Sequence, residues 1–427
     1  MTTLVLILSL LLGSIGLGLP IAFALAAVSI GALMFTGADM SIVVQRLYEG
    51  TNSFPLLAVP LFILAGTIMN HGGISTRLMN FARALVGSMR GGLAAVNVVT
   101  SMFFAGMSGT SMSDTAAVGG VMIPQMIKRG YSPAFTAAIT ASSSTIGVII
   151  PPSVPMVILA AYMGISTGAL FAAGIISGLL LGLGLIFVGW IVSVKRQYPA
   201  EEPFTFRQAT SSFLSAAPAL VMPLIVLGGI LGGIFTPTEA SGIAVVYGIV
   251  IALVVYRSLS FAKLYQCFVE SAVLTGAVML VTATAHVLGF TFTYLALADA
   301  VLEPVSQMEF GPVMLLVVLA AFLIVVGTFL DGIAMMFIVV PLFLPATQLV
   351  GIDPLQFAMV VMICWGIGQQ TPPVGAALFI TSVIARVDVL RITYANLPFI
   401  AVMFIVLALV ILLPEWIVLS MPRWLGL

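Results

Sequence analysis

The sequence has very little charge. Only 7% of its 427 residues are charged, with 14 basic and 14 acidic side chains, whereas soluble domains carry about 25% charged residues. Hydrophobic residues make up 61% of the chain. This composition is not typical of a soluble globular domain, and the zero formal net charge argues against nucleic-acid binding.

Residues that bind metals or form disulfides are also scarce. The two cysteines, Cys267 and Cys364, lie in apolar runs and indicate neither a disulfide framework nor a metal site. The only histidines are His71 and His286, which excludes a His-rich metal centre. No Gly-x-x-x-x-Gly-Lys-[Ser/Thr] loop occurs, so we do not expect an ATP-driven pump. We expect no cofactor.

Long apolar runs are what the chain has in abundance. Runs of about 20 apolar residues recur along its length, and a helix of that length crosses the hydrocarbon core of a membrane. A β-barrel would show short alternating segments instead. The chain is apolar from Leu4, so we expect a retained first helix and not a removed signal peptide. The sequence therefore predicts an all-α polytopic membrane protein.

The spacing of acids and prolines indicates an internal repeat. Asp114 precedes a proline by ten residues, and Asp331 does the same. The two prolines are Pro124 and Pro341. Each acid follows a glycine-containing interruption of an apolar run. We therefore expect Asp331 to be the counterpart of Asp114.

A second spacing supports the same repeat. Pro133 precedes a Pro-Pro pair by eighteen residues, and Pro354 precedes another pair by eighteen. The polar stretch 195–212 separates the two halves. We predict a first repeat over 1–194, a cytoplasmic linker over 195–212 and a second repeat over 213–427. Each repeat is expected to contain a re-entrant hairpin (about 93–127 and 312–350) and a helix broken at Pro-Pro (134–163 and 356–385).

The charge distribution predicts that the repeats are inverted. The ends of hairpin 93–127 carry basic residues, whereas the ends of hairpin 312–350 carry acids and no Lys or Arg. A threading of about ten crossings places every Lys and Arg except Arg46 and Arg423 in cytoplasmic loops, in line with the positive-inside rule. Both chain ends are then periplasmic. Inverted repeats with broken helices are the architecture of secondary transporters.

Polar interruptions mark the expected hairpin tips. Non-helical backbone is tolerated at membrane depth only where it is buried in protein or lines a wet cavity. Free carbonyls and hydroxyls there suit Na⁺, and helix N-termini suit an anion. The alternative is that the small residues only let helices pack closely. Candidate ion- or substrate-binding residues are Ser108, Gly109, Thr110, Ser111 and Asp114 at the first tip, and Gly327, Thr328 and Asp331 at the second.

Polar residues also precede both Pro-Pro pairs. Consecutive prolines remove amide donors and free the carbonyls upstream of them. A simple proline kink is the alternative explanation. Further candidates are Ser143, Ser144, Thr145, Gly147, Pro151 and Ser153 at the first break, and Gly366, Gly368, Gln369, Gln370, Thr371 and Pro372 at the second.

Several motifs together resemble one transporter family. They are "GMSGTSMSD", "IIPPSVPMVI", "TPTEAS", "FLDGIAMMFIVVPLFLP" and "GQQTPPVGAALF". Over nearly its whole length the chain resembles the large membrane subunit of tripartite ATP-independent periplasmic (TRAP) transporters.

The resemblance implies a location and a set of partners. The location is the bacterial inner membrane, and the mechanism is an elevator movement coupled to Na⁺. The partners are a small four-helix membrane subunit, a periplasmic substrate-binding protein and membrane lipids. The substrate is a small organic acid of the sialic acid or C4-dicarboxylate class.

Three other functions remain open from the sequence alone. "GMSG" places Ser108 in a motif of rhomboid-like intramembrane serine proteases, with His286 as a possible base. That dyad explains neither Asp331 nor the paired prolines. A proton-coupled carrier of another family would usually carry more buried acids. A non-transporting membrane scaffold would not need two hairpin tips.

Overall fold

A computed structural model describes residues 2–200, 205–300, 302–303 and 311–427. Residues 201–204, within the expected linker 195–212, lie outside the described residues, as does the side chain of Ser108. Over the described ranges the chain is helical, and the only β pairing there is an isolated bridge between Arg90 and Ala200.

The described helices of the first half end at the polar stretch near residue 195. In chain order they are α1 (Thr2–Gly16), α2 (Ile21–Phe35), α3 (Ser41–Thr51), η1 (Phe54–Leu57), α4 (Ala58–His71), α5 (Ile74–Val86), α6 (Gly92–Ser108), α7 (Ser111–Lys128), α8 (Pro133–Ser144), α9 (Ile146–Ile149), α10 (Val154–Met163) and α11 (Thr167–Lys195).

The described helices of the second half begin at residue 206. They are α12 (Phe206–Leu231), α13 (Pro237–Val250), η2 (Ile251–Val255), α14 (Phe261–Tyr294), α16 (Pro312–Gly327), α17 (Gly332–Leu349), α18 (Pro354–Gly368), α19 (Ala376–Ala385), α20 (Val389–Leu412), α21 (Pro414–Ile417) and α22 (Ser420–Leu425).

Local sequence signals explain where several of these helices begin. Thr236 and Glu239 form a capping box at the start of α13, in which each side chain bonds the other's backbone N–H. The Ser166 hydroxyl accepts a hydrogen bond from the N–H of Ala169 at the start of α11. These bonds satisfy amides that have no partner inside the helix.

Many of the helices are long and apolar enough to cross a membrane. Among the described residues seven helices meet this test by length and composition, or eight if α8–α9 and α10 form one bent span. That pair bends by 43° at its break. Shorter apolar helices include α6, α16, α18 and α19. The predicted fold class, an all-α polytopic membrane protein, is confirmed.

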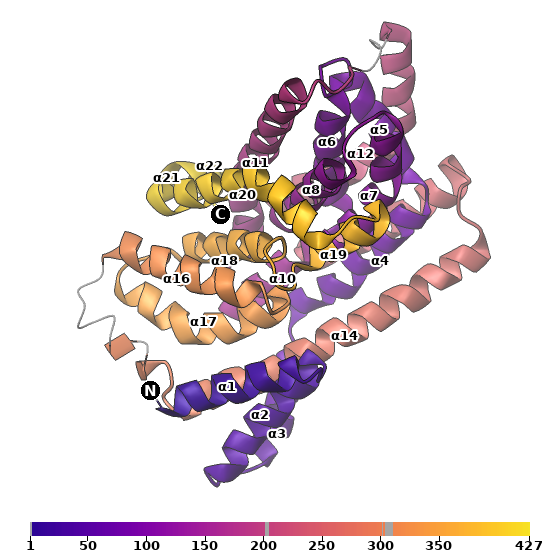
Figure 1. Ribbon diagram of the computed structural model, residues 1–427. Coiled ribbons are helices and arrows are strands. Elements are labelled where there is room, and N and C mark those ends of the chain that lie inside the picture. The colour runs from indigo at the N-terminus through magenta and orange to yellow at the C-terminus, as the bar shows by residue number, and fades with distance from the viewer. Residues whose placement is uncertain (1, 201–204, 301, 304–310) are drawn as a thin grey trace.

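The helices pack as two groups that meet along one seam. In the first group α14 packs against α2, α3 and α4, and α13 packs against α4 and α12. In the second group α7, α8 and α19 pack together, and α16 packs against α17 and α18. Across the seam, α14 contacts α17, and α4 contacts α10. Figure 1 shows α14 as a long diagonal helix between α1–α3 and the remaining helices.

The helix starts of the two halves keep a nearly constant offset. Helices α7 and α8 begin at positions 111 and 133, and α17 and α18 begin at positions 332 and 354, so the interval within each pair is the same. Helices α10 and α11 begin at positions 154 and 167, and α19 and α20 begin at positions 376 and 389, again with equal intervals. The offset between the halves changes by a single position from the first set to the second. Corresponding helices therefore follow one another in the same order and at the same spacing.

This offset corrects the expected pairing of the two acids. Asp331 is the N-cap of α17, just before the first residue of that helix, whereas Asp114 lies inside the first turn of α7. The two acids are therefore about one helical turn out of register. By position, the counterpart of Asp331 is Thr110, the N-cap of α7.

The prolines follow the corrected register. Pro124 lies inside α7, and both Pro341 and Pro345 lie inside α17. Pro124 and Pro345 are equally far from the starts of their helices. Pro124 therefore corresponds to Pro345 and not, as expected from the sequence, to Pro341.

Candidate transport site

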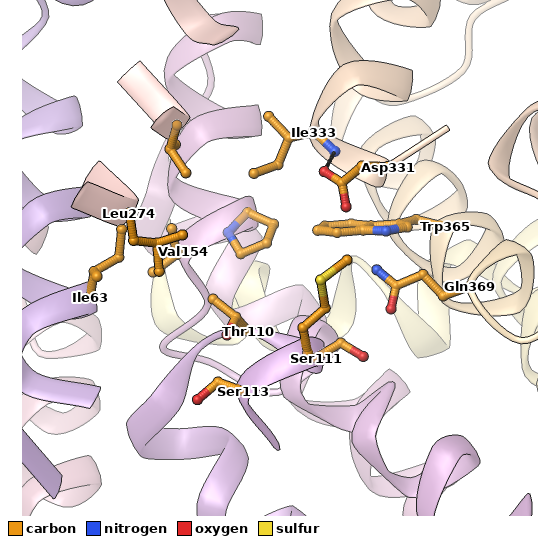
Figure 2. Close-up of a pocket in the computed structure, with 13 residues that line it drawn as sticks. Ile63, Thr110, Ser111, Ser113, Val154, Leu274, Asp331, Ile333, Trp365 and Gln369 are labelled. Carbon is orange, nitrogen blue, oxygen red and sulfur yellow. Dashed lines mark hydrogen bonds between the residues drawn. The ribbon is translucent and has the colours of Figure 1, made fainter. Parts of the chain in front are cut away.

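A cavity of about 540 Å³ lies at the seam where the helix breaks meet. Its volume is within the range of small-molecule sites. Figure 2 shows Asp331, Trp365 and Gln369 on one wall, with Ile63, Val154 and Leu274 opposite. Its lining consists of Ile63, Thr110, Ser111, Met112, Ser113, Val154, Pro155, Leu274, Val278, Asp331, Ile333, Trp365 and Gln369.

The lining residues come from both helix groups. Ile63 belongs to α4, and Leu274 and Val278 belong to α14. The polar lining residues belong to the other group, at the starts of α7 and α17 and the end of α18. The N-termini of α7, α10 and α17 all border the cavity. The positive ends of these helix dipoles favour an anion there.

The first tip and the first break form a buried oxygen-rich cluster. The Thr115 hydroxyl donates to the Ser144 hydroxyl at 2.7 Å, and the hydroxyls of Ser111 and Ser144 lie 3.4 Å apart. The Asp114 carboxylate lies directly against Gly147, where an added Cβ would overlap its Oδ2. Asp114 and Thr115 are fully buried. One carboxylate and several hydroxyls thus gather behind the cavity wall.

The first tip also bonds the chain just beyond the first Pro-Pro pair. Gly109 has a φ of +63°, a conformation that glycine adopts at little cost. Its carbonyl accepts a hydrogen bond from the N–H of Val154 at 3.2 Å. The Ser153 hydroxyl donates to the carbonyl of Val148. The Pro151–Pro152 peptide bond in this break is cis, as is Pro372–Pro373 in the second break.

The second tip packs against the second break through backbone atoms. A Cβ added at Gly368 would lie 2.6 Å from the carbonyl carbon of Gly327. The Thr328 hydroxyl donates to the carbonyl of Val325, and the Thr371 hydroxyl donates to that of Ile367. The Asp331 carboxylate accepts from the N–H of Ile333 at 3.1 Å. Asp331 also lines two smaller neighbouring cavities of about 120 and 140 Å³.

The two breaks are joined by a buried polar network. The Gln370 side chain accepts hydrogen bonds from Ser142 at 2.7 Å and from Asn396 at 3.0 Å, and its amide N–H donates to the Thr145 hydroxyl. Gly366 packs against Thr145 as well. Because all four polar residues of this network are buried, it holds the two broken helices in a fixed relation.

The candidate residues therefore divide into several groups. Thr110, Ser111, Asp331 and Gln369 line the large cavity. Ser143 instead takes part in a buried network with Asn97 and Ser101 on α6. The remaining candidates lie at the hairpin tips and helix breaks, either behind the wall of the large cavity or next to the cavity of about 140 Å³. They are Gly109, Asp114, Ser144, Thr145, Gly147, Pro151, Ser153, Gly327, Thr328, Gly366, Gly368, Gln370, Thr371 and Pro372.

Several residues of the site were not predicted from the sequence. Thr115 lies one helical turn after Ser111, a spacing that could have indicated it. Asn396 is a polar residue within an apolar run, which is a usual sign of function or pairing. Trp365 and Leu274 carry no comparable signal, because aromatic and aliphatic residues are common in membrane helices.

His286 does not resemble a catalytic base. Its ring packs edge-on against Tyr162 with 5.1 Å between centroids, and its side chain lies against Gly50. These neighbours come from α10 and α3. The side chain of Ser108, its proposed protease partner, lies outside the described residues.

Over its described residues the chain is a helical membrane protein whose broken helices border a cavity, and broken helices at a binding site are typical of transporters. The YdaH transporter of Alcanivorax borkumensis has a similar fold, with a TM-score of 0.65 and 15% identity over 89% of this chain and 88% of that chain.

Sequence comparisons identify the family. The family "Tripartite ATP-independent periplasmic transporter, DctM component" matches residues 6–416. The C4-dicarboxylate TRAP large permease protein of Pseudomonas aeruginosa is 36% identical over 92% of both chains. The sialic acid TRAP large permease protein of Vibrio cholerae is 34% identical over 97% of both. The chain belongs to the TRAP large permease family, which is a family of transport proteins and not of proteases.

Proposed function

We propose that this chain is the permease subunit of a Na⁺-coupled importer of a small organic acid. The substrates of its relatives, a C4-dicarboxylate and sialic acid, are both organic acids. The observation that carries the proposal is the position of the cavity at the seam between two helix groups. A rigid movement of the broken helices along α4 and α14 would carry the polar wall from one membrane face to the other.

In this proposal the two halves are inverted repeats. The nearly constant offset between corresponding helix starts supports a repeat. The basic ends of hairpin α6–α7 and the acidic ends of hairpin α16–α17 support opposite orientations in the membrane. Inner-membrane location and periplasmic termini belong to the same proposal.

The first cation site of the proposal is the oxygen cluster behind the wall. Ser111, Thr115 and Ser144 offer hydroxyl oxygens there, and Asp114 offers negative charge. Hydroxyls and unwound backbone carbonyls suit Na⁺ in transporters of this architecture. The second site lies where Gly327 meets Gly368, next to Thr371. The substrate carboxylate binds in the cavity, facing the helix N-termini.

The partners follow from the family description. A tripartite system has two components besides this one, which we propose are a small membrane subunit and a periplasmic substrate-binding protein. Exposed apolar side chains on α12 and α13, such as Leu224 and Val246, suit lipid or a partner helix.

A cross-link across the seam tests the elevator movement. Val278 on α14 and Ile333 on α17 line the same two cavities. Cysteines at both positions, joined by a flexible cleavable reagent, should stop uptake into proteoliposomes that contain all three components. Cleavage of the reagent should restore uptake. Each single-cysteine variant is the control, and parental uptake by the cross-linked protein would contradict the movement.

A further inference from the structure

Two residues that line the large cavity have polar atoms that the hydrogen bonds of the protein leave unused. Both amide atoms of Gln369 are buried and have no hydrogen-bond partner in the structure, and the same holds for Nε1 of Trp365. Each of these side chains is only 3% exposed. A buried amide without a partner costs about 1–3 kcal/mol, so a ligand that reached these atoms and bonded them would gain affinity.

Packing fixes the position of Trp365, and the absence of hydrogen-bond partners distinguishes Gln369 from the next residue in the chain. The Trp365 ring packs directly on Gly332, where an added Cβ would overlap it. This packing fixes the ring on the cavity wall, one helical turn before Gln369 on the same helix. Figure 2 shows Trp365 between Asp331 and Gln369 on this wall. The adjacent Gln370 differs, because its amide is bonded to Ser142, Asn396 and Thr145.

The charges of the cavity lining restrict the number of carboxylates that a ligand can carry. Among the described residues that line the cavity there is no Lys, Arg or His, and Asp331 is the only charged side chain. One carboxylate of a ligand can face the helix N-termini and the hydroxyls of Thr110 and Ser111. A second carboxylate would have no cationic side chain to meet, and on the wall with Asp331 it would be repelled.

The opposite wall suits an uncharged apolar group. Ile63, Leu274 and Val278 form it, and no polar side chain from α4 or α14 lines the cavity within the described part of the chain. Burial of apolar ligand surface against these residues contributes about 25 cal/mol per Å².

We infer that Gln369 and Trp365 determine specificity by binding a neutral hydroxyl or oxo group of a monocarboxylate with an apolar body, and that dicarboxylates are rejected. This inference rests on the proposed transport function. The Trp365 indole can only donate, whereas the Gln369 amide can both donate and accept. Together they can satisfy an oxo group by donation, or a hydroxyl by donation and acceptance.

Calorimetric binding to the purified chain in Na⁺ tests the inference. The probes are 2-hydroxy-4-methylpentanoate, its oxo analogue, 4-methylpentanoate and succinate. The hydroxy or oxo acid should bind most tightly and succinate least. In Trp365→Phe and Gln369→Leu the affinity for the hydroxy and oxo acids should fall about threefold to tenfold. The affinity for 4-methylpentanoate should stay within about twofold, because that probe lacks the neutral group.

Controls separate specificity from folding and from cation binding. Trp190→Phe alters an indole that is 40% exposed and distant in sequence from the cavity lining, so it should change no affinity. Both cavity variants should unfold at or above the temperature of the parent, because each removes a buried polar group that has no hydrogen-bond partner.

Several results would overturn the inference. They are tighter binding of succinate, failure of both functionalised monoanions to bind, and equal losses for all probes in the variants. A raised Na⁺ requirement in Gln369→Leu, with unchanged probe selectivity, would make Gln369 a cation ligand and would also overturn it. Na⁺-driven uptake of a dicarboxylate would refute this specificity and leave the proposed transport function intact.

Discussion

At the scale of single residues, Asp331 is the acid whose loss should matter most. Its carboxylate caps α17 through the N–H of Ile333, and the residue borders the large cavity and the two smaller ones beside it. We predict that Asp331→Ala lowers uptake at least about tenfold, because negative charge at membrane depth is usually functional. Loss of the cap alone would cost only about 1 kcal/mol of stability. Uptake, expression and thermal unfolding are measured side by side.

Asp331→Asn separates the cap from the charge. Asparagine caps helices about as well as aspartate, so this variant should regain stability. If the main role of Asp331 is to hold the hairpin tip in shape, Asp331→Asn should also regain part of the uptake. Near-parental uptake in Asp331→Ala at normal expression would show that the acid is dispensable.

Ser144 tests the first cation site. Its hydroxyl accepts a hydrogen bond from Thr115 and lies 3.4 Å from that of Ser111. Removal of one oxygen ligand should raise the Na⁺ concentration for half-maximal uptake about tenfold in Ser144→Ala. Ser143→Ala is the matched control, because Ser143 bonds Asn97 and Ser101 on the side of α6. Equal Na⁺ requirements in the two variants would remove Ser144 from the site.

The sequence predicted these polar residues better than it predicted their pairing. An intramembrane carboxylate beside clustered hydroxyls is costly, so Asp114 and Asp331 could be recognised as candidates without a structure. The predicted equivalence of the two acids was wrong because α17 contains two prolines one helical turn apart. The ten-residue spacing selected Pro341, whereas Pro345 is the counterpart of Pro124. Only the helix starts reveal the shift of one turn. Gln369 has no side-chain hydrogen bond, whereas Gln370 is bonded by residues of α8 and α20, and no local sequence pattern reveals this difference.

At the scale of elements, the contact between hairpin α16–α17 and the second break sets the geometry of the seam. A Cβ at Gly368 would lie within 2.8 Å of three backbone atoms of Gly327, and backbone cannot rotate away as a side chain can. We predict that Gly368→Ala displaces the hairpin, costs about 1–3 kcal/mol of stability and lowers uptake strongly. Thermal unfolding and uptake check both effects.

Gly120→Ala is the control for this substitution. Gly120 lies inside α7, and an added Cβ there would meet nothing within 4 Å. Alanine should therefore be neutral or slightly stabilising, since it favours helix more than glycine does. If Gly368→Ala behaves like this control, the close approach of the two backbones is unimportant for transport.

The elements themselves were largely predictable. Apolar run length and the Pro-Pro pairs gave the broken helices, because proline cannot continue a helix hydrogen-bond ladder. The breaks at 150–153 and 369–375 lie within the predicted segments 134–163 and 356–385. The seam was not predictable, because the residues of α4 and α14 that line the cavity are apolar like most of both helices, and their partners lie far away in sequence.

At the scale of the whole molecule, the chain should not transport alone. It belongs to a tripartite family, and substrate capture by a separate binding protein is part of the proposed function. We predict no uptake by proteoliposomes that contain only this chain, even with Na⁺ and substrate present. Addition of the small membrane subunit and a substrate-loaded binding protein should produce uptake. Strong uptake by the isolated chain would contradict the proposed need for the small membrane subunit and the binding protein.

Dependence of uptake on a Na⁺ gradient tests the central claim most directly. Proteoliposomes containing the chain, the small subunit and a substrate-loaded binding protein are diluted into Na⁺ or into an equal concentration of K⁺. The account predicts accumulation of labelled substrate only with the inward Na⁺ gradient, and its loss when a Na⁺ ionophore dissipates that gradient. Equal accumulation in K⁺ would contradict Na⁺ coupling, and with it the cation sites proposed at the two hairpin tips.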